Sequence, residues 1–161
     1  MKRNILTLVI AVFALTQAAA QTYDNLWKQA DIIARKDQPR SEIGVMKKII
    51  SKASAAKDYG QLMAAEMRQM ILWNEISADS LTPNVKRMEA EVQKVKDPAL
   101  KAVRYAVLGK VYRDMDEKKS LESFKKALQQ PELLAKHTST EYVPLTLKGV
   151  DGSSFNNDLL H

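Results

Sequence analysis

The chain has 161 residues, and its 25 Lys and Arg against 19 Asp and Glu give a formal charge of +6 at pH 7. This length is typical of a single domain, because domains usually contain roughly 100–200 residues. The absence of cysteine excludes disulfides, a thiolate zinc site, a cysteine nucleophile and lipid attachment through a lipobox cysteine. Few glycines and prolines, five of each, favour a helical protein over a β-sandwich, which needs many turns.

The first twenty residues predict a secretory signal peptide. Lys2 and Arg3 form a basic start, an apolar run follows from Ile5 to Leu15, and small residues at 18–20 precede the cleavage site. The run of about eleven residues is too short to cross a bilayer, which takes about twenty. We therefore expect cleavage after position 20 and export to the periplasm, cell envelope or extracellular space, with the membrane involved only through this cleaved segment.

The rest of the chain predicts an all-α fold. Apolar residues recur at helical spacing in six segments separated by Pro, Asp and Ser. The expected helices cover residues 23–36, 39–57, 59–76, a fourth around the stripe 85–95, 98–115, and a sixth that carries Leu121, Phe124, Ala127 and Leu128 and ends at Pro131. The apolar stripe of the third comprises Met63, Met67, Met70 and Ile71.

Two helix starts have local signals. Asp58, followed three residues later by Gln61, has the form of a capping box, in which each side chain satisfies a backbone N–H of the other residue. Asp97 precedes Pro98, which combines an N-cap side chain with a proline in the first helical turn.

The spacing of these helices predicts three stacked antiparallel hairpins. They begin near Tyr23, Asp58 and Asp97, at steps of about 35 to 39 residues, which is the range of right-handed helical-repeat arrays. We expect a helical domain over 21–135 and an extended tail over 136–161. Residues 141–148 are suited to one edge strand, and Asp158 to Leu160 have the pattern of a starting helix.

The third hairpin resembles a tetratricopeptide repeat. Residues of its first helix, Tyr105, Leu108, Gly109 and Tyr112, keep the spacing of that repeat. Residues of its second helix, Ser120, Phe124 and Ala127, also keep it, but the turn between the helices is one residue short. The other two hairpins match in length alone.

The sequence contains no constellation typical of catalysis. There is no nucleophile elbow, phosphate-binding glycine loop or zinc-binding helix, and His137 and His161 are isolated. Glu66 and Glu75 have no second carboxylate three or four residues away in a buried stripe, so a paired acid and base is unsupported. Mixed-sign charges argue against nucleic-acid binding. We expect a non-enzymatic protein without a cofactor or resident metal.

The residues singled out for binding or for the contacts between hairpins are apolar. Met63, Met67 and Met70 fit core packing, a peptide-binding groove or a copper(I) site, because thioethers suit all three. Trp27 and Trp73 lie beside apolar stripes and are expected to anchor hairpin interfaces. Tyr105 and Tyr112 complete the set of candidate partner-binding or interface residues.

Three further stretches carry a resemblance that covers nearly all of the mature chain. These stretches are residues 23–29 (YDNLWKQ), residues 58–62 (DYGQL) followed by 79–81 (DSL), and a tail with 142–145 (YVPL) and 155–161 (FNNDLLH). Together they are similar to the start of the large extracellular α2-macroglobulin-like proteins of Bacteroidetes-type bacteria, with Asn157 where that family usually has His.

The resemblance implies a role in a larger assembly. Proteins of that family trap proteases, many through a thioester that needs Cys and Gln, which this chain cannot form. We therefore expect the N-terminal helical module of such a protease-trapping envelope protein, as a fragment or truncated reading frame that docks or orients the larger body. The alternative is a free-standing periplasmic repeat protein that binds a protein or peptide in its concave face.

Overall fold

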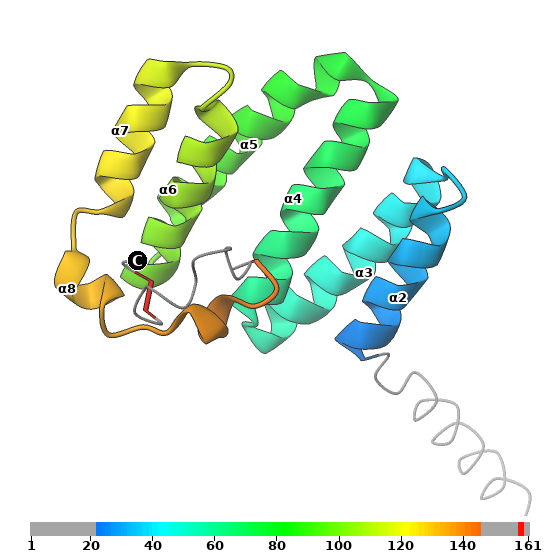
Figure 1. The fold of residues 1–161 in the computed structure, drawn as a ribbon, viewed down its shortest axis with the longest axis horizontal. Coiled ribbons are helices and arrows are strands. Elements are labelled where there is room, and N and C mark those ends of the chain that lie inside the picture. The colour runs from blue at the N-terminus through cyan, green and yellow to red at the C-terminus, as the bar shows by residue number, and fades with distance from the viewer. Residues whose placement is uncertain (1–21, 146–157, 160–161) are drawn as a thin grey trace, which may run out of the picture.

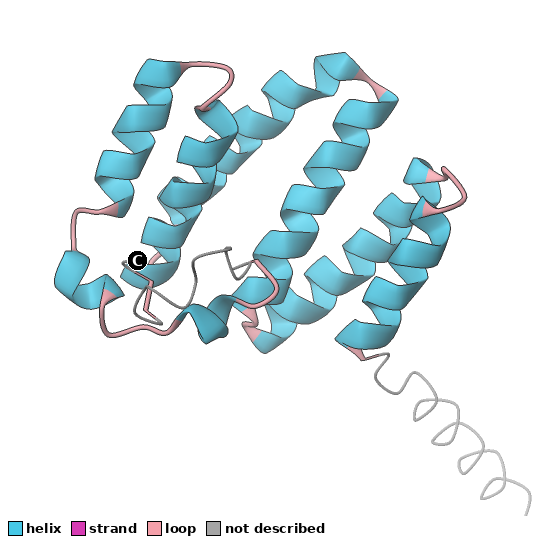
Figure 2. Cartoon of the chain, in the orientation of Figure 1, coloured by secondary structure: helices cyan, strands magenta, loops and turns pink. Residues whose placement is uncertain are grey.

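The computed structural model describes residues 22–145 and 158–159, and within them the fold is all-α (Figures 1 and 2). The α-helices are α2 (Tyr23–Ala34), α3 (Pro39–Ala56), α4 (Tyr59–Ile76), α5 (Leu81–Lys94), α6 (Pro98–Tyr112), α7 (Glu117–Ala127) and α8 (Pro131–Leu134). Two 3₁₀ helices, η1 (Ala78–Ser80) and η2 (Ser139–Tyr142), complete the described part. None of the helices in that part is long and apolar enough to span a membrane.

Side-chain caps explain where most of these helices begin. The Asp58 carboxylate accepts the backbone N–H of Gln61 at 3.2 Å, and the Asp97 carboxylate accepts that of Leu100 at 2.9 Å. Asp116 caps α7 in the same way. The Gln61 side chain does not complete the predicted capping box, because its Oε1 accepts the indole N–H of Trp27 at 2.7 Å.

The helices from α2 to α7 form a row. The C-terminal segment, which comprises the described residues 131–145 and 158–159, returns beneath this row (Figure 1). The most extensive contacts join α3 to α4 and α6 to α7. In contrast, α4 and α5, which the sequence predicts as one hairpin, pack only lightly on each other.

The core consists of three clusters of buried side chains. The first lies among α2, α3 and α4 and contains Leu26, Ala30, Ile43, Val45, Met46, Ile49, Ala65 and Leu72. The second contains Met70, Val85, Val92, Leu108 and Tyr112. The third contains Met63, Leu100, Val107 and Tyr142. Because α4 contributes to all three, it connects the two ends of the row.

Four residues of the predicted apolar stripes are exposed. Ile71 on α4 is 45% exposed, and Leu72 beside it is buried instead. Leu121 and Phe124 on α7, and Leu128 directly after it, are also exposed, whereas Ala127 of the same predicted stripe is buried together with Ser120 and Ser123. The small residues of α7 are therefore buried more completely than its large apolar residues.

The predicted C-terminal strand and helix are also wrong within the described residues. Residues 141–142 belong to η2, residues 143–145 form no strand, and Asp158 makes an isolated antiparallel bridge with Thr138 rather than starting a helix. Part of the segment expected to be extended is thus a 3₁₀ helix whose Tyr142 is buried. The predicted signal peptide (1–20), His161 and the tail residues 146–157 and 160–161 lie outside the described residues.

The tail reaches the helices at Gly60, in the first turn of α4. A Cβ atom at this position would lie 2.4 Å from the carbonyl oxygen of Val143 and 2.5 Å from the carbonyl carbon of Tyr142. Both are backbone atoms, so no side-chain rotation could relieve the overlap. Only glycine allows the tail to approach α4 this closely.

We predict that Gly60→Ala destabilises the protein by about 1–3 kcal/mol, the usual cost of overpacking. Gly44→Ala, in the exposed interior of α3, is the matched control, because a Cβ there meets nothing within 4 Å. The control should gain about 0.5–1 kcal/mol from helix propensity. Urea unfolding monitored by circular dichroism measures both changes, and stabilisation by both substitutions would contradict the close contact.

Candidate interaction groove

An apolar concavity lies between α6, α7 and the C-terminal segment. Its volume is about 540 Å³, and it is open to solvent. This lies within the range of roughly 300–1,000 Å³ that is usual for ligand pockets. The lining residues are Met67, Ala102, Val103, Ala106, Val107, Lys110, Arg113, Phe124, Ala127, Leu128, Leu134, Leu145 and Leu159.

One wall of this groove comes from the way α7 packs on α6. The Ser120 hydroxyl donates to the carbonyl oxygen of Gly109 at 2.8 Å. A Cβ atom on Gly109 would lie 2.9 Å from the ring of Phe124, so glycine allows the ring to lie against the α6 backbone. Phe124 and Leu128 both line the groove and stay partly exposed.

The floor is formed by small residues on α6. Ala102 and Ala106 are four residues apart and therefore share a face of the helix. Their short side chains leave space where Leu or Val would fill it. Met67 of α4 extends the floor, so the groove lies over both α4 and α6.

The opposite wall is formed by the returning chain. The backbone N–H of Leu159 donates to the carbonyl oxygens of Leu134 and His137, at 3.3 and 3.0 Å. The backbone N–H of Leu145 donates to the carbonyl oxygen of Tyr142 at 2.8 Å. These bonds hold the side chains of three leucines, 134, 145 and 159, at the groove.

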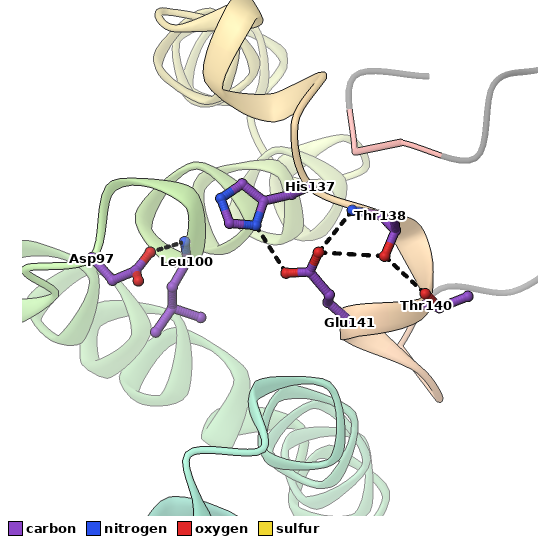
Figure 3. Close-up of polar contacts among 6 residues, drawn as sticks. All are labelled: Asp97, Leu100, His137, Thr138, Thr140 and Glu141. Carbon is purple, nitrogen blue, oxygen red and sulfur yellow. Dashed lines mark hydrogen bonds and ion pairs between the residues drawn. The ribbon is translucent and has the colours of Figure 1, made fainter.

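A polar cluster stabilises the turn before this wall (Figure 3). One carboxylate oxygen of Glu141 accepts the backbone N–H of Thr138 at 2.9 Å, which completes a capping box for η2. Its other oxygen lies 2.8 Å from Nδ1 of His137. The hydrogen bond with His137, followed by that from Thr138, lowers the pKa of Glu141.

The two carboxylates considered as catalytic candidates pair with arginines. Burial raises the pKa of Glu66, although the guanidinium of Arg104, 3.0 Å away, opposes the shift. Glu75 is half-exposed and lies 3.8 Å from Arg68. The described residues contain no group of three His, Cys, Asp or Glu side chains that could hold a metal ion.

The structure distributes the seven predicted site residues over the three clusters and the groove. Trp27 and Trp73 pack on the first cluster. Met70, Tyr105 and Tyr112 belong to or pack on the second, where the Tyr112 hydroxyl donates to Glu89 at 2.5 Å. Met63 is buried in the third cluster, and Met67 packs on that cluster and also lines the groove. Met70 therefore belongs to a different cluster from Met63.

Sequence reasoning missed most of the groove. None of Ala102, Ala106, Lys110 and Arg113 was singled out from the sequence as a site residue. The available signal was in α7, where the small residues Ser120, Ser123 and Ala127 lie beside the large residues at 121, 124 and 128.

Comparison with known proteins found no family model that matches this chain, and no curated protein and no solved structure matches it significantly.

We predict that Glu141→Gln lowers the stability at neutral pH and that the difference from the parent chain closes in acid. Because the folded-state pKa is lowered, the carboxylate stabilises the fold above its unfolded pKa of about 4.3, and this contribution is lost as the pH falls through the folded-state value. Thermal melts between pH 3 and pH 7 measure the difference. Glu132→Gln on exposed α8 is the control and should show no such trend; equal pH profiles for both variants would contradict the role of Glu141.

Proposed function

We propose that this protein is an exported, non-catalytic helical interaction module that binds a protein or peptide segment in the groove between α6, α7 and the C-terminal segment. The observation that carries this proposal is the open apolar concavity of about 540 Å³ with Phe124 and Leu128 at its rim. Exposed apolar surface of this kind usually marks a binding site.

The chemistry of the groove suits binding rather than catalysis. Among the described lining residues, Lys110 and Arg113 are the ionisable ones, and the remainder are apolar. Apolar walls bind a partner by removing its apolar surface from water, which contributes about 25 cal/mol per Å² of surface removed.

We further propose that the helices form three stacked hairpins in a repeat-like array. Support comes from the α6–α7 hairpin, whose extensive contacts include the tetratricopeptide-like positions: Ser120 bonds to Gly109, and Phe124 lies against it. The groove lies on the face to which α4 and α6, the first helices of the second and third hairpins, contribute. In a repeat array, such a face is a natural binding surface.

The chain would serve as the N-terminal module of an α2-macroglobulin-like protease-trapping protein, docking or orienting the larger body. Support comes from the stretches that carry the resemblance, because they contact one another in the fold. Trp27 of the first stretch donates to Gln61 of the second, and Gly60 of the second lies against Tyr142 and Val143 of the tail. A free-standing peptide-binding repeat protein is the alternative, and the reading frame downstream of position 161 in the gene distinguishes the two.

We predict that Ala106→Trp abolishes peptide binding without unfolding the protein. The indole would fill the groove from its floor, where the present side chain is small and the space is open. The probe is a set of peptides selected from a random 16-residue display library on residues 21–161, with affinities measured by fluorescence anisotropy.

Ala55→Trp on the exposed face of α3 is the matched control. Affinity should fall at least tenfold for Ala106→Trp and stay within twofold for the control. Failure to select any peptide, or equal affinities for the two variants, would contradict binding in the groove.

A further inference from the structure

The groove has a cationic end. Lys110 and Arg113 line it, and no Asp or Glu of the described residues does so. Arg113 lies 3.5 Å from the carboxylate of its neighbour Asp114, but both side chains are exposed, so water screens this pair. Lys110 makes no ion pair within 4.0 Å with any residue of the described ranges.

This end belongs to a basic part of the molecule. Residues 98–127 contain eight Lys and Arg and four Asp and Glu, an excess of four positive charges. Without residues 1–20, which include Lys2 and Arg3, the chain has 23 Lys and Arg and 19 Asp and Glu, which is also an excess of four. The α6–α7 hairpin alone therefore has the same formal charge, +4, as the whole of residues 21–161.

The two cations lie along the axis of the groove. Lining residues extend over α6 from Ala102 to Arg113, which spans about 16 Å at the helical rise of 1.5 Å per residue. The cations are at the C-terminal end of this span, and the apolar part formed by Ala102, Val103 and Ala106 is at the other. A ligand that fills the groove therefore meets apolar surface first and positive charge beyond it.

The shape and the charge favour one class of partner. A planar membrane makes poor contact with a concave surface whose floor lies between α7 and the returning chain. A second copy docked through the same face would bring no carboxylate to Lys110 and Arg113, because the described lining residues include none. A polypeptide segment can enter the groove and present opposite charge at its end.

We propose that the partner is a polypeptide segment with apolar anchor side chains on one side of a cluster of acidic residues. Its anchors lie in the groove over Ala102 and Ala106, and its carboxylates lie beside Lys110 and Arg113. This inference rests on the function proposed above and adds the chemistry of the partner. The positive field of the α6–α7 hairpin also accelerates the encounter with such a segment.

The experiment compares charge-reversal variants in the binding assay on the chain 21–161. Lys110→Glu/Arg113→Glu reverses the end of the groove, and Lys47→Glu/Lys48→Glu on the exposed face of α3 makes the same change in net charge elsewhere. Peptides selected from the library should combine apolar residues with Asp or Glu. Their affinity should fall about tenfold or more for the groove variant, about threefold or less for the control, and also fall as NaCl is raised from 0.05 to 0.5 M.

The outcomes separate this inference from the proposed function. If selected peptides are neutral or basic, or bind the Lys110→Glu/Arg113→Glu variant unchanged, and yet lose binding to Ala106→Trp, the acidic partner is wrong and the groove remains the binding site. If no peptide binds, or if Ala106→Trp has no effect, both proposals are overturned.

Two further measurements test the competing partners. Cosedimentation with vesicles of phosphatidylglycerol that is lost in Ala106→Trp would identify a membrane as the occupant and overturn the proposal. Sedimentation equilibrium that shows a dimer dissociated by Ala106→Trp would identify a second copy and also overturn it. We expect a monomer and no groove-dependent vesicle binding.

Discussion

The first turn of α4 is the contact on which the rest of the structure depends. Within four residues, Asp58 caps the helix, Gly60 allows the tail backbone to approach, and Gln61 accepts the indole N–H of Trp27. This turn thus joins the beginning, the middle and the end of the described chain. The tail could not occupy its observed position with a side chain larger than hydrogen at position 60, because the obstructing atoms belong to its backbone.

The groove is a consequence of this contact together with the packing of α7. Once the tail lies against α4, Tyr142 is buried in the third cluster, and Leu145 and Leu159 reach the edge of α6. On the other side, α7 packs on α6 through the hydrogen bond of Ser120 to Gly109 and the ring of Phe124 against Gly109, and Phe124 and Leu128 stay partly exposed at the groove. The interaction face therefore combines two elements that are far apart along the chain, and neither would form it alone.

Local signals in the sequence were sufficient for the helices themselves. Asp58 and Asp97 fix the starts of α4 and α6 through caps that involve only the next three residues, and both helices begin where predicted. The predicted hydrogen bond from the backbone of Asp58 to the Gln61 side chain is replaced by one from the indole N–H of Trp27, which is 34 residues away in the sequence. Helix boundaries are local properties, whereas the partner of a side chain is not.

The site was harder to predict because it depends on which face of a helix is buried. Periodicity placed Leu121, Phe124 and Leu128 of α7 in the core, on the ordinary assumption that large apolar residues are inside. The assumption failed at Leu121 and Leu128, which are exposed, whereas Ser120 and Ala127 are buried and the Phe124 ring lies against Gly109 while staying partly exposed. The prediction of a strand in the tail failed for a related reason. Val143 and Pro144 have the composition of an edge strand, but the described residues contain no sheet that they could join.

The central claim is that the C-terminal segment packs on α4 and α6 and thereby completes the interaction face. The most direct measurement is a nuclear Overhauser spectrum of residues 21–161 with labelled methyl groups. The account predicts cross-peaks from the ring protons of Tyr142 to the methyl groups of Met63, Leu100 and Val107, the other members of the third cluster. A Tyr142 ring with random-coil shifts and no cross-peaks to these methyl groups would contradict it.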